Sequence, residues 1–274
     1  RPNSTDNRSW AWPVLVSEIM LQQTPVARVL PTWRAWMNRW PTPADLAASP
    51  TSEVIRAWDR LGYPRRAIRL HRAAQVIVAD HGGFVPSDLD ALLSLPGVGE
   101  YTAGAVRAFA FDIPALTLDT NVRRVLARYL QGQALPTGQV TRAERELTWS
   151  IMPADGATKW MAGLMELGAL VCTAKKPDCN HCPLVTNCAW VAAGSPPPVQ
   201  PPRRQPQYVG SDRQARGYIL AMLRNDVEAL DLNTIRAGSD YVWADEAQAE
   251  RALSGLANDG LINLRNDGKY CLPM

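Results

Sequence analysis

The chain has 274 residues, of which 46% are hydrophobic and 20% charged, and its formal net charge is +3. This length allows one large domain or two smaller ones around a substantial core. No apolar run approaches the ~18–20 residues that span a bilayer, and no basic-then-apolar leader opens the chain. These features exclude a membrane-spanning helix and predict a cytoplasmic protein.

The positive charge is unevenly distributed along the chain. Residues 1–190 contain 20 Lys and Arg against 16 Asp and Glu, a difference of +4. Residues 213–274 contain 7 against 9, a difference of −2. A polyanionic partner is therefore expected to bind the first two-thirds of the chain.

Residues 13–190 predict many short helices separated by turns rich in Pro, Gly and Ser. The sequence over 51–54 supplies an N-terminal cap for one of them, and Gly82-Gly83 marks the end of another. No run alternates with a period of two well enough to predict a sheet here, so the expected class is all-α. The helices expected before residue 100 cover 14–23, 43–48, 52–58, 65–80 and 89–94.

A glycine-containing turn, Leu95-Pro96-Gly97-Val98-Gly99, joins the helix over 89–94 to a longer helix over 100–111. Its glycines permit unusual dihedral angles and the close approach of another backbone. The start of the second helix offers free N–H groups and the positive end of its dipole to a phosphate. Such a turn alone is commonly structural. With Tyr101 behind it and an Asp eighteen residues further on, it predicts a helix-hairpin-helix that binds the DNA backbone through Pro96, Gly97, Val98 and Gly99.

Two segments each place one acid among apolar neighbours, Glu18 within 17–24 and Asp119 within 118–126. A buried carboxyl group holds its proton tightly and can serve as a general acid near neutral pH. A second carboxylate that stays ionised can stabilise an oxocarbenium ion, as in glycoside hydrolysis. Taken singly, each acid could instead be a helix cap or an ion-pair partner.

Four of the five cysteines lie within seventeen residues, at Cys172, Cys179, Cys182 and Cys188. The spacing C-x6-C-x2-C-x5-C predicts a metal or cluster site rather than a disulfide framework. Thiolates favour an iron–sulfur cluster or zinc, and four of them also suit tetrahedral zinc. Zinc ribbons usually contain two C-x2-C pairs, whereas this loop contains one.

The C-terminal third begins with a proline-rich stretch over 194–207, which predicts an extended linker. It separates a domain over 1–193 from a small domain over 208–274. Helices are expected over 212–224, 232–236 and 245–258, followed by strands over 261–264 and 269–272 around Asn266-Asp267-Gly268. This order predicts a winged-helix-like module, and the net charge of −2 over residues 213–274 favours a structural or protein-contact role over DNA reading.

The hairpin, the two acidic segments and the cysteines together closely resemble the MutY-type adenine DNA glycosylases of the endonuclease III superfamily, over about residues 14–190. Ser17-Glu18-x-Met20-Leu21-Gln22-Gln23-Thr24 is close to a signature of that branch. The resemblance implies a helix-hairpin-helix glycosylase fold with a loop that holds a 4Fe-4S cluster through the four cysteines. It implies a nucleoid-associated, monomeric repair enzyme that binds double-stranded DNA with mismatched or oxidised bases. Its expected reaction is removal of adenine opposite 8-oxoguanine or guanine.

The resemblance also implies roles for individual residues. Glu18 would protonate adenine at N7, Asp119 would stabilise the sugar cation, and Asn121 would orient the carboxylates. Tyr101 would line the active site, where bifunctional relatives carry a lysine, so strand cleavage is not expected. The remaining residues are expected at the DNA: Gln23 and Tyr63 as wedges in the duplex, Leu21 and Thr24 near the opposing base, and Lys175 and Lys176 at phosphates, with Arg65 and Arg66 expected to add further phosphate contacts.

The sequence departs from the family pattern at Thr120, Pro64 and Ala162, where Gly, Tyr and Gln or Glu are usual. The MutT-like domain that reads 8-oxoguanine does not fit into residues 208–274, and a segment before Trp10 is expected to be missing. Two other functions stay open. One is a glycosylase for thymine or uracil opposite guanine, against which Glu18 argues, and the other is a non-catalytic DNA-scanning or redox module.

Overall fold

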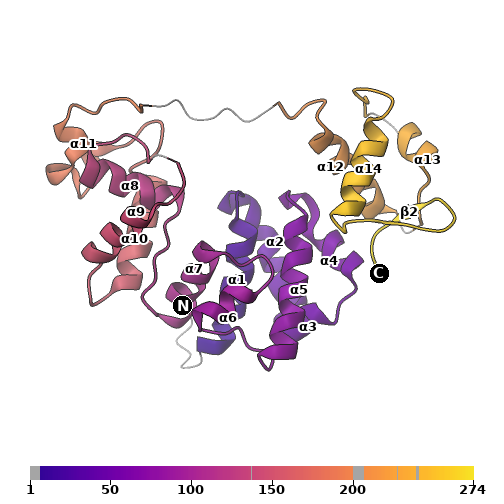
Figure 1. Cartoon of the computed structure of the whole chain (residues 1–274), viewed down its shortest axis with the longest axis horizontal. Helices are drawn as coiled ribbons and strands as arrows, with labels where there is room; N and C mark the ends of the chain where they lie inside the picture. The colour runs from indigo at the N-terminus through magenta and orange to yellow at the C-terminus, as the bar shows by residue number, and fades with distance from the viewer. Residues whose placement is uncertain (1–6, 137, 200–206, 227, 239–240) are drawn as a thin grey trace. The chain divides into compact units, whose positions relative to one another are not determined.

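The structure is a computed structural model that describes residues 7–136, 138–199, 207–226, 228–238 and 241–274. Helices make up most of these residues, and two short strands lie near the C-terminus (Figure 1). The expected class, an all-α fold with one small hairpin, is confirmed. In the described part of the chain no helix is both long and apolar enough to cross a membrane. Two compact units form, one from residues 1–86, 94–97 and 204–274 and the other from 87–93 and 98–203.

The N-terminal part of the first unit is a set of helices around a tryptophan-rich core. Trp36 lies edge-on to Trp40 and Trp58 with ring centroids 4.8 and 5.5 Å apart, and all three are buried. These three tryptophans therefore belong to the core of this part. The elements are α1 (Asn7–Leu21), α2 (Val26–Arg39), α3 (Pro43–Ala47), α4 (Thr51–Trp58), η1 (Asp59–Leu61) and α5 (Arg65–Asp80).

Several boundaries differ from the expectation by a residue or more, and the helix expected over 245–258 begins at Gln248. Helix α1 begins seven residues before position 14, and it continues through Pro13. The same helix ends at Leu21, and residues 22–24 form a turn. Helix α2 covers 26–39 and contains Pro31. No separate helix was predicted for this segment.

The second unit packs α8 against α10 around a small apolar core that includes Val122, Val125 and Met161. A Cβ at Gly168 on α10 would lie 2.7 Å from the Cβ of Asn121 on α8, so the glycine lets the two helices approach closely. The elements of this part of the chain are α6 (Leu89–Ser94), α7 (Glu100–Phe111), α8 (Thr120–Gln131), α9 (Arg142–Ile151), α10 (Ala157–Leu170), η2 (Cys179–His181), η3 (Val185–Asn187) and α11 (Ala189–Ala192).

The C-terminal module, residues 208–274, belongs to the first unit and has the winged-helix-like order expected from the sequence. It consists of α12 (Asp212–Asn225), α13 (Leu232–Ala237), α14 (Gln248–Asn258), β1 (Asn263–Leu264) and β2 (Tyr270–Cys271). The strands pair antiparallel, and Leu230 bridges to Tyr270. Both strands are two residues shorter than expected. Of the expected linker, residues 200–206 lie outside the described residues, and the boundaries at 193 and 208 stay a prediction.

Candidate active site and nucleic-acid interface

Asp119 of the second unit is fixed by two hydrogen bonds. It caps the N-terminus of α8, where one carboxylate oxygen, Oδ1, accepts from the Val122 backbone N–H at 2.7 Å. The other oxygen, Oδ2, accepts from Nδ2 of Asn121 at 2.8 Å. Donors on both oxygens hold the carboxylate in one orientation at the start of the helix. The expected partnership of Asn121 with this carboxylate is thus present in the structure.

Arg124, which no motif of the sequence singles out, connects this acid to the cysteine loop. Its Nη2 donates to Oδ1 of Asn121 at 2.9 Å and to the Gly168 carbonyl at 2.6 Å. Its Nε donates to the carbonyl of Cys172 at 2.7 Å. Burial lowers the pKa of Arg124, and the neighbouring Cys172 opposes that shift. One guanidinium therefore links the orientation of Asp119 to the position of the first cysteine.

Glu18 lies on α1 of the first unit and is 9% exposed. Its chain neighbours Ile19 and Met20 are buried as well, so this stretch of α1 faces the interior, and the role of Glu18 stays a prediction. Tyr101, in the first turn of α7 of the second unit, is half-buried. The chain thus supplies one acid from each unit, Glu18 from the first and Asp119 from the second.

The two residues expected to act as wedges occupy unusual backbone conformations. Gln23 has φ of 57° and Tyr63 has φ of 47°, both in the left-handed region that residues other than glycine rarely adopt. Each is exposed, Gln23 after α1 and Tyr63 after η1. Non-glycine residues in this region cost about 1–2 kcal/mol each and gather at functional sites. Their geometry is consistent with a role at the tips of two short turns.

One buried arginine holds these two turns together. Arg66 is only 6% exposed, so the expectation that it contacts phosphate is wrong. Its guanidinium lies 5.1 Å from the centroid of the Trp58 ring and 5.6 Å from that of Tyr63. Burial lowers its pKa to about 10, so it stays charged near neutral pH. It donates to the carbonyls of Ile19 (3.0 Å), Met20 (2.7 Å), Gln22 (2.6 Å), Leu61 (3.3 Å) and Gly62 (3.0 Å) and to Oγ1 of Thr24 (2.9 Å).

The pattern of α5 could have revealed this position. Arg66, Leu70, Ala73 and Ile77 share one helical face, and all four are buried. Thr24 is also buried, at 7% exposure, and its hydroxyl faces Arg66, so a contact of this side chain with DNA stays a prediction. Leu21, the last residue of α1, is half-buried. Arg65 is exposed but forms an ion pair with Asp259 at 3.3 Å, so its charge is already matched within the protein.

The helix-hairpin-helix expected over 89–111 is present as α6, a turn and α7. Gly97 has φ of +86°, and a Cβ there would lie 2.9 Å from the Cβ of Arg69, so only glycine fits. Its carbonyl accepts from Nε2 of Gln22 at 3.3 Å, which ties the turn to the end of α1. Gly99 is the N-cap of α7, which begins at Glu100 without a side-chain cap. The first N–H groups of α7 therefore have the arrangement that suits a phosphate.

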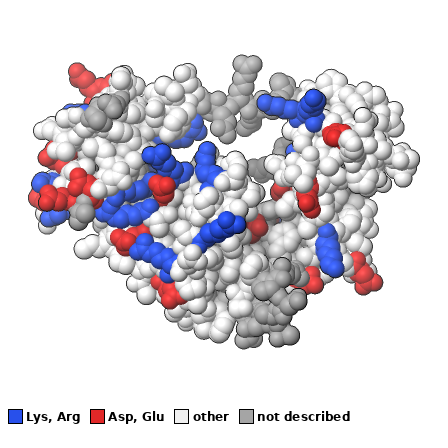
Figure 2. Space-filling view, turned by 180° about the vertical axis from the view of Figure 1, so that it is seen from behind, with Lys and Arg blue, Asp and Glu red and all other residues white. Residues whose placement is uncertain are grey.

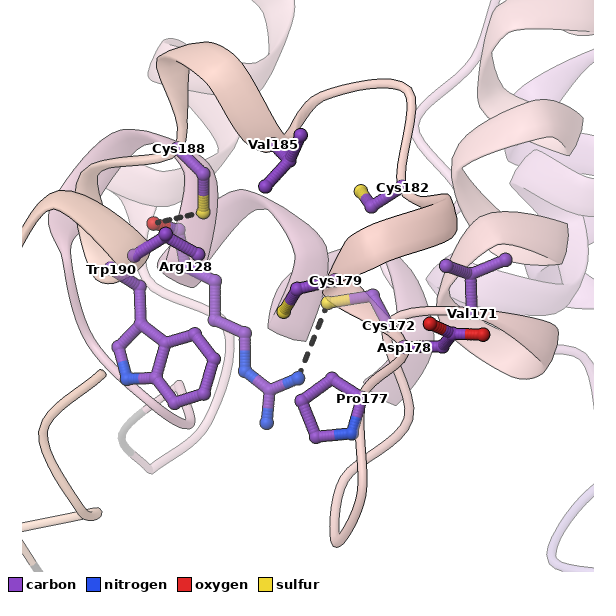
Figure 3. A pocket seen from close by; sticks show the side chains of 11 residues that line it. Arg128, Val171, Cys172, Pro177, Asp178, Cys179, Cys182, Val185, Cys188 and Trp190 are labelled. Atoms are coloured by element: carbon purple, nitrogen blue, oxygen red, sulfur yellow. Dashed lines mark hydrogen bonds between the residues drawn. The ribbon is translucent and has the colours of Figure 1, made fainter. Parts of the chain in front are cut away.

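The four cysteines line one pocket in the second unit, together with Arg128 and Trp190 (Figure 3). Arg128 donates to Sγ of Cys172 at 3.3 Å and lies 4.5 Å from the centroid of the Trp190 ring. Burial and the three neighbouring thiols raise the pKa of Cys179. Within the described ranges, no three His, Cys, Asp or Glu side chains are drawn close enough together to hold a metal ion. The donor set, four thiols and a guanidinium facing one sulfur, still has the chemistry that a thiolate-ligated cluster needs.

Lys175 and Lys176 are exposed in the loop between the first two cysteines. Thr173 stabilises this loop by donating from its hydroxyl to the Lys176 carbonyl at 2.6 Å. On the face shown in Figure 2, Lys and Arg side chains are interspersed with Asp and Glu. Specific cations rather than one large basic patch are therefore expected to contact a polyanion.

Comparison with known proteins relates the chain to DNA repair enzymes. A family described as the HhH-GPD superfamily of base excision DNA repair proteins matches residues 16–150. An adenine DNA glycosylase of Mycobacterium tuberculosis is 48% identical over 264 residues, which are 96% of this chain and 85% of that protein. The adenine DNA glycosylase of Homo sapiens is 40% identical over 189 residues, covering 67% of this chain and 34% of that one.

Solved structures show the same fold. A thermostable thymine-DNA glycosylase superposes with a TM-score of 0.61 at 29% identity, over 67% of this chain and 85% of that one. A trapped covalent intermediate of endonuclease III with DNA superposes with a TM-score of 0.59 at 26% identity, over 70% and 91%. The resemblance inferred from the sequence is confirmed, and the chain belongs to the adenine DNA glycosylases of the HhH-GPD superfamily of base-excision repair enzymes.

Proposed function

We propose that this enzyme removes adenine mispaired with 8-oxoguanine or guanine by hydrolysing the N-glycosidic bond. The observation that carries the proposal is the orientation of Asp119, whose two carboxylate oxygens both accept hydrogen bonds at the start of α8. A buried second acid, Glu18, accompanies it in the chain. The family relationship over 96% of the chain supports adenine as the leaving base.

In the proposed reaction, the bond between the sugar carbon C1′ and adenine N9 breaks, and its electron pair leaves with the base. Glu18 donates a proton to adenine N7, so the base departs neutral. Asp119 stays anionic and stabilises the positive charge that develops on the sugar. Asn121 and the helix N-terminus keep that carboxylate in place. Water then adds to C1′ and gives up a proton, which restores the protonated form of Glu18 and completes the hydrolysis.

Tyr101 makes the enzyme monofunctional in this proposal. A phenol cannot form the Schiff base that an amine would form with the opened sugar. The product strand should therefore stay intact until it is treated with base, and borohydride should trap little covalent complex. Efficient trapping would mean that another amine of the protein attacks the sugar.

The DNA contacts are proposed from the resemblance to the family. The hairpin, Pro96 to Gly99, would bind phosphates through the start of α7, and Lys175 with Lys176 would bind phosphates from the cysteine loop. Gln23 and Tyr63 would fill the space left by the flipped adenine. Leu21 and Thr24 would lie near the opposing base. The partner is double-stranded DNA in the cytoplasm, at the nucleoid, and the enzyme is proposed to act as a monomer.

We also propose that Cys172, Cys179, Cys182 and Cys188 hold a 4Fe-4S cluster. When bound, such a cluster supplies four thiolate–iron bonds that stiffen the loop carrying the two lysines. The anaerobically purified protein should contain about four irons per chain and little zinc. Stoichiometric zinc without iron would contradict this assignment.

The opposing base is tested by single-turnover excision on duplexes that carry A:8-oxoG, A:G, G:T or G:U. We expect excision of adenine from the first two and no release of thymine or uracil. Release of thymine or uracil alone would replace the adenine proposal with a mismatch-pyrimidine activity, the activity named for the thymine-DNA glycosylase with the same fold.

A further inference from the structure

The C-terminal module shares an apolar core with the helices on either side of the Tyr63 turn. Ile55 on α4 and Ile68 on α5 belong to one buried cluster with residues of the module. Leu223 on α12 and Leu256 on α14 are among those residues, at 2% and 1% exposure. The module is therefore packed onto α4 and α5 within the first unit rather than joined to them by the chain alone.

Polar contacts reinforce this packing on the N-terminal side of the turn. Nη1 of Arg224, near the end of α12, donates to the carbonyl of Asp59 at 2.6 Å. In return, Arg56 on α4 donates to the carbonyl of Arg224 and, at 3.0 Å, to that of Asp226. Burial lowers the pKa of Arg224. Asp59, the residue that follows α4, is thus held by a half-buried guanidinium from 165 residues further along the chain.

A second contact holds the C-terminal side of the turn. Arg65, the first residue of α5, forms an ion pair with Asp259 at 3.3 Å. Asp259 lies at the end of α14 and is also paired with Arg216 of the module. Arg224 and Asp259 therefore contact the chain immediately before and after the segment that contains Tyr63.

The enclosed turn needs outside support because its backbone is strained. Asp59 (φ 44°) and Tyr63 (φ 47°) are non-glycine residues in left-handed conformations, and Gly62 between them has φ of 77°. Such residues persist only where surrounding contacts fix them. Arg66 supplies some of those contacts from the buried side, by donating to the carbonyls of Leu61 and Gly62. The module supplies them at the two ends.

We propose that the C-terminal module is a brace that holds residues 59–65 in the conformation that presents Tyr63 to the duplex. It positions the wedge and does not itself read DNA. Its net negative charge and the pairing of Arg65 with Asp259 both disfavour phosphate contacts at this place. The proposal rests on the wedge role of Tyr63 given above.

A double-mutant cycle in the full-length protein tests the brace. Arg224→Met keeps the apolar stem and removes the guanidinium, and Tyr63→Ala removes the wedge. The quantity measured is the affinity for a duplex with an A:8-oxoG mismatch divided by that for the matched duplex. We expect each single variant to lower this ratio, Tyr63→Ala by roughly tenfold as for loss of one stacked ring. We expect the double variant to equal Tyr63→Ala alone, because the brace acts only through the wedge.

The controls separate the possible failures. Arg251→Met removes a guanidinium of the module that pairs with Asp212 and Asp245, and it should leave the ratio unchanged. Asp259→Asn removes the ion pair with Arg65 at the other end of the turn, and it should give the same result as Arg224→Met. If one of these two variants fails to fold, the other still tests the brace. An unchanged ratio in both brace variants, or reductions that add fully to that of Tyr63→Ala, would overturn the brace while leaving the wedge. No reduction in Tyr63→Ala would overturn the wedge, and the brace with it.

Discussion

Arg66→Lys tests whether one buried guanidinium holds the turns of Gln23 and Tyr63 together. The substitution keeps the positive charge and the apolar stem. It replaces a planar fork of five N–H donors with an ammonium that has three. In the structure, Arg66 serves six acceptors on two segments, and it caps the C-terminal end of α1 through the carbonyls of Ile19 and Met20.

The expected loss of stability follows from those acceptors. Four of the six bonds are buried, to Ile19, Met20, Thr24 and Leu61, and a lysine can keep at most three. At least one buried acceptor therefore loses its partner, which costs about 1–3 kcal/mol. Loss of the guanidinium over the rings of Trp58 and Tyr63 adds about 1 kcal/mol. The free energy of unfolding should fall by about 2–4 kcal/mol, and the melting temperature by about 5–15 °C.

Thermal unfolding followed by circular dichroism measures this change. Arg69→Lys is the matched control, because Arg69 is exposed on the same helix and its substitution should cost less than about 0.5 kcal/mol. Arg66→Lys should also lower the preference for mismatched over matched duplex, since both wedge turns lose their common anchor. Equal melting temperatures for the two lysine variants would refute the anchoring role.

Gly168→Ala places a Cβ 2.7 Å from that of Asn121, which donates to the proposed catalytic carboxylate of Asp119, so excision should slow, whereas Gly163→Ala on the same helix meets nothing within 4 Å and should not change the rate. Equal rates for the two variants would contradict that arrangement. Lys175→Ala combined with Lys176→Ala should weaken binding to every duplex and reduce its salt dependence by about one unit for each phosphate that is no longer neutralised; an unreduced slope would mean that these lysines face solvent. Burial lowers the pKa of His71, so the unfolded state binds its proton first. The free energy of unfolding should therefore fall as the pH drops below about 6.5, and His71→Gln should remove this component, whereas an identical acid dependence in the variant would assign it to other groups.

Local sequence patterns sufficed for the elements whose chemistry is local. The hairpin, the cap at Asp119 and the cysteine loop each lie within about twenty residues, and the residues that define them appear together in the chain. The family relationship that these motifs suggest is confirmed by the comparisons.

Long-range contacts could not be predicted in this way. Arg66 looks like one more cation in a basic helix, and only its place on the buried face of α5 distinguishes it from Arg69. The bond from Arg224 to Asp59 joins residues 165 apart, and no local pattern encodes it. Arg124 reaches the Cys172 carbonyl from 48 residues away for the same reason. Arginines with several donors connect distant segments, so the sequence shows their presence but not their partners.

Protonation of the departing adenine by Glu18 is the step on which the proposed reaction depends, and single-turnover excision from an A:8-oxoG duplex measures it. Glu18→Gln keeps the shape of the side chain and removes the proton donor, so the rate should fall by a factor on the order of at least a hundred while the variant still binds the mismatch. Glu166→Gln, an exposed glutamate on α10, serves as the matched control and should react at the unmodified rate. Excision by Glu18→Gln at the rate of that control would contradict the assignment of Glu18 as the acid.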